Sequence, residues 1–145
     1  MLTYNQGDIF TSDAQVLVNP VNTTGFAVAG LSAKFSRRYP ESLPAYVLAC
    51  LTRRLQVGRP HLHRRGKGPW ILHFPTKNHI WEHAKTSHIE AGLQDFAANY
   101  KAWGITSAAF PKLGCGEGRL DWAEVSPLMD KHLRDLPGIQ ISIYV

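Results

Sequence analysis

The first third of this chain contains apolar patterns typical of strands, followed by apolar residues at helical spacing. Leu2–Asn5 alternates apolar and polar positions, as expected for a half-buried strand. Val16–Asn19 is a continuous apolar run closed by Asn-Pro, which predicts a buried, central strand. Apolar residues then recur at helical spacing, which predicts one helix from Leu31 to Tyr39 and another from Glu41 to Leu55.

The middle of the chain has the pattern of a hairpin. Pro60–Arg65 is a polar strand candidate, and Trp70–Phe74 is an apolar one. Gly66–Pro69 lies between them and supplies the turn. We therefore expect these two strands to be antiparallel neighbours.

Two capping boxes predict the starts of the helices in the last part of the chain. Ser87 with Glu90 predicts a helix that ends near Trp103, and Asp121 with Glu124 predicts a helix that continues through Leu133. The apolar runs Ile105–Phe110 and Ile139–Val145 predict two further strands. Strands interleaved with helices over residues 1–145 predict one α/β domain, a three-layer α/β/α fold around a mixed sheet.

Composition narrows the class of protein further. Hydrophobic residues make up 44% of the 145 residues, which excludes a disordered chain, and no apolar run approaches the roughly 20 residues that span a bilayer. Cys50 and Cys115 form neither a disulfide framework nor a metal-ligand set, so we expect a reducing, cytoplasmic setting, no metal and no cofactor. The net charge of +5 is modest evidence for a polyanionic partner, and it is equally compatible with simple solubility.

The segment Phe110–Trp122 carries the strongest functional signal. It places three glycines within five residues between an apolar strand and a helix cap. Glycine permits positive φ and close approach of a ligand, and free N–H groups at such a turn suit a phosphate or diphosphate. An ordinary flexible loop is the alternative. A second glycine-bearing turn, Asn19–Gly30, favours the ligand site, because both turns follow strands whose carboxyl ends border ligands in open α/β sheets.

Four segments, in this order, resemble the motifs of the macrodomains, which are ADP-ribose-binding modules. They are Gly7-Asp8-Ile9, Asn19-Pro-Val-Asn22, Gly25 with Gly30-Leu31, and Gly114-Cys-Gly-Glu-Gly118. Phe74-Pro-Thr-Lys77 and Leu120-Asp-Trp122 look closest to the branch of DarG-type DNA ADP-ribosyl glycohydrolase antitoxins and the terminal ADP-ribose protein glycohydrolase. The resemblance covers nearly the whole chain.

The resemblance implies a role for each matching residue. Lys77 would be the catalytic residue. Asp8 and Ile9 would bind near the adenine, and Asn22 would bind the distal ribose. The two loops would be formed by Gly25, Gly30 and Leu31, and by Gly114, Cys115, Gly116, Glu117 and Gly118. A partly desolvated lysine near an anomeric carbon can attack it or, when charged, can stabilise the departing base. No pair of carboxylates of the kind that most glycosidases use is evident.

Plainer interpretations stand beside these roles. Asp8 could cap a turn, Asn22 could form an Asx-turn, and Lys77 outside its motif would be an ordinary surface lysine. Cys115 is better explained by a useful backbone amide than by a nucleophilic thiol. Where relatives carry further glycine this chain has Phe26–Ala29, whose β-branched Val28 suits positive φ poorly.

The basic cluster around Arg64, Arg65 and Lys67 has two interpretations, a solvated face or a path for single-stranded DNA. Our leading hypothesis is a monomeric hydrolase that removes ADP-ribose from a modified base, thymidine or guanosine in DNA, opposite a cognate ADP-ribosyltransferase toxin. One alternative is a reader that binds ADP-ribose without cleaving it, favoured by Phe26–Ala29. Another is a hydrolase of ADP-ribosyl-glutamate or O-acetyl-ADP-ribose.

Overall fold

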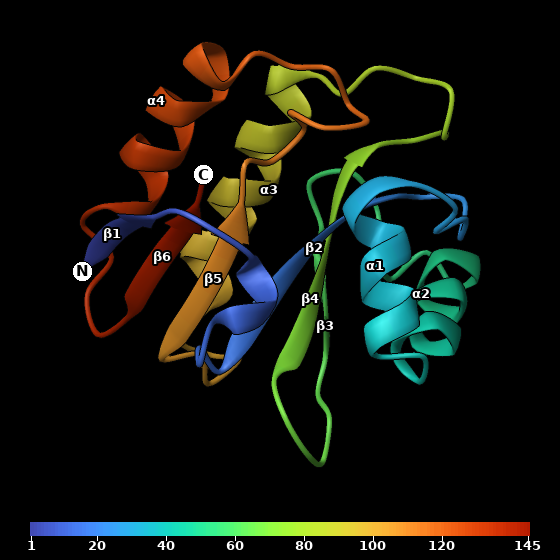
Figure 1. The fold of residues 1–145 in the computed structure, drawn as a ribbon, viewed down its shortest axis with the longest axis horizontal. Coiled ribbons are helices and arrows are strands. Elements are labelled where there is room, and N and C mark those ends of the chain that lie inside the picture. Colours follow the sequence, from blue (N-terminus) through green and yellow to red (C-terminus); the bar gives the residue numbers. More distant parts are fainter.

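A six-stranded mixed sheet forms the centre of the computed structural model, which describes residues 1–145 (Figure 1). Its strands lie in the order β1-β6-β5-β2-β4-β3, and every neighbouring pair is parallel except β3 with β4. The strands are β1 (Leu2–Asn5), β2 (Val16–Asn22), β3 (His61–His63), β4 (Trp70–Lys77), β5 (Ser107–Pro111) and β6 (Gln140–Tyr144). The predicted hairpin is therefore the one antiparallel pair.

Helices cover both faces of the sheet, which confirms the three-layer α/β/α prediction (Figure 1). One face carries α1 (Gly30–Arg38), α2 (Ser42–Leu51) and the short 3-10 helix η1 (Ile9–Thr11), and the other carries α3 (Thr86–Asn99) and α4 (Trp122–Leu133). No helix is both long and apolar enough to cross a membrane.

Burial on both faces explains why the central strand has an unbroken apolar run. Val16 and Val18 pack into the core beneath α3 and α4, whereas Leu17, between them, packs against α1. Close packing continues on the α3 side, where a Cβ atom on Gly92 would lie 2.4 Å from the ring of Phe74. Alternate side chains point to opposite faces of a strand, so both sets must be apolar.

Strand β2 runs three residues beyond its predicted end at Asn19. Asn19-Pro20 is typical of a strand end, because proline has no N–H to donate to a ladder. Here only Val16 and Leu17 pair with β5, whereas β2 pairs with β4 as far as Asn22. Pro20 is thus tolerated where β2 and β5 have already separated, and this separation opens the sheet at its centre.

Several other predicted boundaries were wrong. Strand β4 continues past Phe74 to Lys77, β3 is confined to His61–His63, and α2 ends at Leu51 instead of Leu55. Other elements shift by one or a few residues: α1 starts at Gly30 and ends at Arg38, β5 begins at Ser107, β6 spans Gln140–Tyr144 and α3 ends at Asn99.

The two predicted capping boxes fared differently. Helix α3 begins at Thr86 with Lys85 at the N-cap, so Ser87 lies inside the first turn and cannot cap it. Helix α4 does begin after Asp121, although no side-chain cap hydrogen bond forms there. A capping motif in the sequence therefore gave one helix start correctly and missed the other.

Candidate functional site

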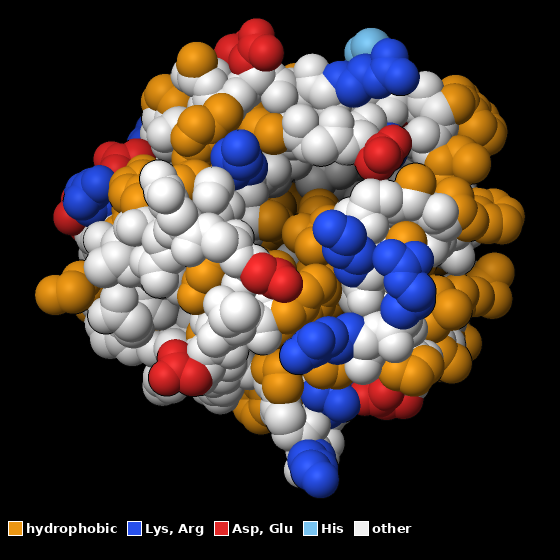
Figure 2. Space-filling model, in the orientation of Figure 1, with side chains coloured by type: hydrophobic (Ala, Val, Ile, Leu, Met, Phe, Trp, Pro, Cys, Tyr) orange, Lys and Arg blue, Asp and Glu red, His pale blue; other side chains and the backbone are white.

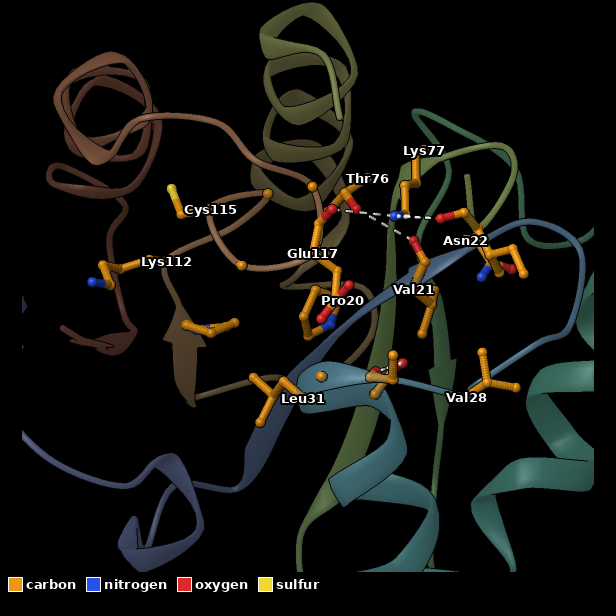
Figure 3. Close-up of a pocket in the computed structure, with 18 of the residues that line it drawn as sticks. Pro20, Val21, Asn22, Val28, Leu31, Thr76, Lys77, Lys112, Cys115 and Glu117 are labelled. Carbon is orange, nitrogen blue, oxygen red and sulfur yellow. Dashed lines mark hydrogen bonds between the residues drawn. The ribbon is translucent and has the colours of Figure 1, made fainter. Parts of the chain in front are cut away.

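A cavity lies at the carboxyl ends of β2 and β5, where the two strands part (Figure 3). Figure 2 shows it as a hollow with hydrophobic side chains on its floor. Its volume is about 490 Å³, within the range of small-molecule sites. It is lined by Gly7, Pro20, Val21, Asn22, Phe26, Val28, Ala29, Gly30, Leu31, Ser32, Thr76, Lys77, Ile80, Pro111, Lys112, Gly114, Cys115, Gly116, Glu117, Gly118, Tyr144 and Val145.

The position follows from the topology. The chain passes from β2 to β4 on one side of the sheet and then returns across β2 to β5. Strands on either side of such a switch point send their connections in opposite directions, which leaves a crevice that α/β proteins use for ligands.

The first wall of the cavity is the N-terminus of α1. The N–H groups of Gly30, Leu31 and Ser32 have no acceptor in the chain, and Ala29 at the N-cap offers no side-chain hydrogen bond. The first N–H bonded within the helix is that of Ala33, which donates to the carbonyl of Ala29. Unpaired donors at the positive end of a helix dipole attract an anion.

The second wall is the glycine-rich turn after β5. The N–H groups of Gly116, Glu117 and Gly118 also have no acceptor in the chain, whereas Cys115 N–H donates to the carbonyl of Lys112. Successive free N–H groups at such a turn can bind an anion. Two sets of donors, from segments far apart in the sequence, thus border one cavity.

The shape of this turn requires glycine at two positions. Gly114 has a φ of +75°, and a Cβ atom on Gly118 would lie 2.5 Å from the carbonyl oxygen of Gly114. Ala84 N–H donates to the carbonyl of Gly118, which ties the turn to the segment before α3. The glycines thus serve backbone packing as well as ligand approach.

Lys77 lies at the end of β4, on the opposite side of the cavity from Lys112 (Figure 3). Its side chain is 8% exposed, and its Nζ donates to the carbonyl of Ile80 at 3.1 Å and to that of Glu117 at 3.5 Å. A charged ammonium has three N–H donors, so one remains for a ligand. Thus an amine, desolvated but hydrogen-bonded, borders the cavity, as predicted from the sequence.

Asn22 is the β2 neighbour of Lys77 in the sheet register. Its Oδ1 accepts from the backbone N–H of Thr24 at 3.0 Å and from the Tyr46 hydroxyl at 2.9 Å, and its Nδ2 donates to the carbonyl of Phe26 at 2.8 Å. The Asx-turn is therefore present. One Nδ2 hydrogen remains free at the cavity, so the predicted contact with a ribose is compatible with this structural role.

Cys115 does not present an activated nucleophile. Burial raises the pKa of its thiol, so the thiol stays protonated near neutral pH. In Figure 3 the Sγ atom lies in the left part of the view, on the side of Lys112 and away from Lys77. The backbone of the turn, not this thiol, supplies the polar groups of the cavity.

The first loop departs from expectation in one respect. Val28 does not have a positive φ, which among non-glycine residues occurs only at Arg53 and Arg119. Its side chain is 67% exposed at the cavity rim. The backbone strain expected from a β-branched residue in this loop is therefore absent.

Three predicted ligand residues lie outside the cavity lining, namely Asp8, Ile9 and Gly25. Asp8 caps η1, where its Oδ1 accepts from Phe10 N–H at 3.0 Å, and Ile9 is buried in the core. Gly7 borders the cavity next to Asp8. The plain interpretation of Asp8 as a cap thus describes its contacts, while its predicted bond to adenine stays a prediction.

The cluster of Arg64, Arg65 and Lys67 lies at the other end of β4 from Lys77. Arg64 donates to the carbonyl of Trp103 and stacks over Trp70, and Arg65 binds Glu41 and the carbonyl of Pro69. These internal contacts are what fix the two guanidinium groups. The structure brings none of the three residues to the cavity.

Sequence reasoning missed several cavity residues that carry no motif. Ile80 and Lys112 follow strands β4 and β5, Tyr144 is the last residue of β6, and Val145 follows it. Their signal was positional, because residues just past the carboxyl ends of parallel strands converge on one edge. The structure holds no cluster of three or more His, Cys, Asp or Glu side chains suited to a metal ion.

Comparisons with known proteins agree with this geometry. The family model for the Macro domain matches residues 18–129. DNA ADP-ribosyl glycohydrolases of Mycobacterium tuberculosis and Thermus aquaticus are 37% and 34% identical to this chain, over 99% of it, and the alignment covers 42% and 41% of their own lengths. The chain thus spans about two fifths of the curated relatives it matches.

Solved structures are equally similar. The macrodomain of Mycobacterium tuberculosis DarG has a TM-score of 0.94 at 37% identity, with 99% of this chain and 97% of that chain covered. Thermosipho africanus DarTG in complex with ADP-ribose has a TM-score of 0.93 at 35% identity, with 98% of this chain and 41% of that chain covered. This chain therefore belongs to the Macro domain family, as its family match, its fold and its cavity at the strand switch point agree.

Proposed function

We propose that this domain removes ADP-ribose from a modified base of a nucleic acid, thymidine or guanosine in DNA. The observation that carries the proposal is the hydrogen-bonded amine of Lys77 in the same cavity as two sets of free backbone N–H donors. The names of the relatives, DNA ADP-ribosyl glycohydrolases, and the ADP-ribose in the Thermosipho africanus complex support the substrate.

In this proposal the diphosphate lies between the N-terminus of α1 and the glycine-rich turn. Donors fixed in place by Gly30 and Gly118 stabilise an anion without reorganisation. The distal ribose then lies toward Asn22 and Lys77, the neighbouring ends of β2 and β4. The adenine lies at the other end of the cavity, near Gly7 and Asp8.

Lys77 acts on the bond between the anomeric carbon and the base nitrogen. As that bond breaks, its electron pair goes to the base, and positive charge develops on the ribose. The Lys77 ammonium gives a proton to the base nitrogen, which leaves a neutral amine beside the anomeric carbon. The amine captures that carbon through its lone pair. Water then attacks the anomeric carbon, the bond from that carbon to Lys77 Nζ breaks, and a proton from the water restores the Lys77 ammonium as ADP-ribose is released.

The test is turnover of an ADP-ribosylated oligonucleotide by the wild type, Lys77→Ala and Lys77→Arg. We expect both variants to lose turnover by two to four orders of magnitude, on the order of what a positioned acid–base group contributes. Lys77→Arg keeps the charge but cannot give up its proton. Undiminished turnover in Lys77→Ala would sink the role of Lys77. Detection of a covalent adduct between Lys77 and ADP-ribose in acid-quenched reactions would support capture of the anomeric carbon by the lysine amine.

A substrate panel separates this proposal from its alternatives. It consists of ADP-ribosylated thymidine DNA, guanosine DNA, glutamyl protein and O-acetyl-ADP-ribose. Turnover of DNA supports the proposal, and exclusive turnover of the protein or acetyl ester would replace it. Calorimetric binding of ADP-ribose without any turnover would identify a reader.

A DNA ADP-ribosyltransferase is the proposed source of the substrate. The relative from Thermosipho africanus, a DNA ADP-ribosyl transferase fused to a DNA ADP-ribosyl glycohydrolase, supports this pairing. Expression of such a transferase in a bacterial host should arrest growth, and co-expression of this domain should restore it. The Lys77→Ala variant should fail to restore growth.

A further inference from the structure

An exposed aromatic pair stands beside the end of the cavity that holds Lys77. The rings of His79 and Trp81 are stacked with centroids 4.6 Å apart and an interplanar angle of 2°. Trp81 is 75% exposed, so one face of its indole is covered by the imidazole while most of the side chain is open to solvent. Nothing in the reaction proposed above uses either ring.

The pair belongs to the segment between β4 and α3, residues 78–85, which projects from the upper right of Figure 1. Hydrophobic side chains extend from that corner of the surface in Figure 2. A large apolar ring this exposed in a folded domain is a candidate contact for a partner.

The segment is held in place at both of its ends. Asn78 accepts from Thr23 N–H at 3.2 Å, and Ala84 N–H donates to the carbonyl of Gly118 at 2.9 Å. Glu82 reaches back to Asn78 N–H at 3.2 Å and lies 4.0 Å from the His79 ring nitrogen. The start of the first loop and the glycine-rich turn are thus both tied to this segment, so the segment has a defined position relative to the site.

Ile80, the residue between His79 and Trp81 in the sequence, links the pair to Lys77. Ile80 lines the cavity, and its carbonyl accepts the hydrogen bond from Lys77 Nζ at 3.1 Å. Trp81, the next residue, lies outside the cavity lining. The exposed ring thus belongs to the residue that directly follows a hydrogen-bond partner of Lys77.

We propose that His79 and Trp81 form a stacking platform for the unpaired base next to the ADP-ribosylated base of a single strand. This deepens the proposed function and rests on it. Bases stack on exposed aromatic rings whatever their sequence, since each has a flat π face. In a duplex the neighbouring base is already stacked and paired, so the platform favours single-stranded substrate.

The kinetic test compares an ADP-ribosylated oligonucleotide with the same ADP-ribosylated nucleoside alone. For Trp81→Leu, which keeps apolar bulk without a ring, we expect KM for the oligonucleotide to rise on the order of tenfold. The preference for oligonucleotide over nucleoside, as a ratio of kcat/KM values, should fall by the same factor. Trp81→Phe should restore most of it. Leu51→Ala, at a 77% exposed position on α2, is the control and should change neither substrate.

A binding test needs no turnover and so separates this proposal from the one on which it rests. Unmodified oligothymidine should quench the tryptophan fluorescence of the Lys77→Ala protein, and Trp81→Phe in that background should abolish the quenching. Equal quenching in both proteins would overturn the platform. So would equal losses by Trp81→Leu on oligonucleotide and nucleoside, or a loss confined to an ADP-ribosylated protein substrate, which would identify a peptide contact.

Discussion

The side chain of Glu117 lies directly over the backbone of Gly30, so that a Cβ atom on residue 30 would come within 2.8 Å of Glu117 Cγ. The two residues belong to the opposite walls of the cavity, the glycine-rich turn and the N-terminus of α1. A carboxylate therefore lies close to both sets of free N–H groups.

Removal of the Glu117 charge should tighten binding of ADP-ribose. Glu117→Gln keeps the length of the side chain but ends its repulsion of the diphosphate, and we expect the Kd to fall by about fivefold at low salt. The gain should shrink at high ionic strength because salt screens exposed charges. Calorimetry at two salt concentrations measures both effects. Glu124→Gln makes the same change of net charge outside the cavity lining and should leave the Kd unchanged.

Substitution by alanine should destabilise the protein at one glycine of the turn and have little effect at another. A Cβ on Gly118 would meet the carbonyl oxygen of Gly114 at 2.5 Å and Ala84 Cβ at 2.7 Å, whereas a Cβ on Gly116 would have open space. Gly118→Ala should lower the free energy of unfolding by about 1–3 kcal/mol. Gly116→Ala should leave it nearly unchanged. Urea denaturation of the pair measures the difference, and equal losses would contradict the packing argument.

The Tyr46 hydroxyl should matter to the ligand site as well as to stability. Burial raises the pKa of Tyr46, so the phenol stays protonated. Its hydroxyl donates to two acceptors on Asn22, the backbone carbonyl at 2.7 Å and Oδ1 at 2.9 Å. Tyr46→Phe should cost about 1–2 kcal/mol of unfolding free energy and weaken ADP-ribose binding, because Asn22 holds the first loop.

The matched control for Tyr46 is Tyr100→Phe. Tyr100 donates its own hydroxyl hydrogen bond to the carbonyl of Pro137, in the turn before β6. Its loss should lower stability by a similar amount but leave the affinity for ADP-ribose unchanged. If both variants weakened binding equally, the effect on the ligand would be a general one of stability.

His73 should make the domain less stable in acid. Burial, followed by the nearby His63 and His61, lowers its pKa from 6.5 to about 3. Below pH 6.5 the unfolded chain therefore binds a proton that the folded chain refuses, and stability falls until the pH reaches about 3. Between pH 6.5 and 4.5 we expect His73 alone to contribute a loss of about 2 kcal/mol.

The measurement for His73 is urea unfolding across that pH range. His73→Gln keeps a polar side chain beside Asn19, whose Nδ2 lies 3.3 Å from His73 Nδ1, but it cannot take up the proton. The variant should lose less stability than the wild type on acidification. Parallel curves for the two proteins would show that other groups dominate.

Local sequence patterns predicted the type of nearly every element, because burial on two faces of a sheet leaves a readable signature. The apolar run from Val16 and the helical spacing from Leu31 to Tyr39 are examples. The glycines of the turn after β5 also stood out, because backbone conformation is a local property that residue type restricts strongly. Lys77 was singled out only by the family resemblance.

Only the tertiary structure decided where strands end and which groups meet. Pro20 is accommodated because β5 has already left β2, a relation between segments roughly ninety residues apart that no local pattern contains. The meeting of the turn after β5 with the N-terminus of α1 at one cavity depends in the same way on strand order. The sequence by itself thus determined the elements and the chemistry, and the topology decided which of them share the cavity, because contacts between distant segments follow from packing.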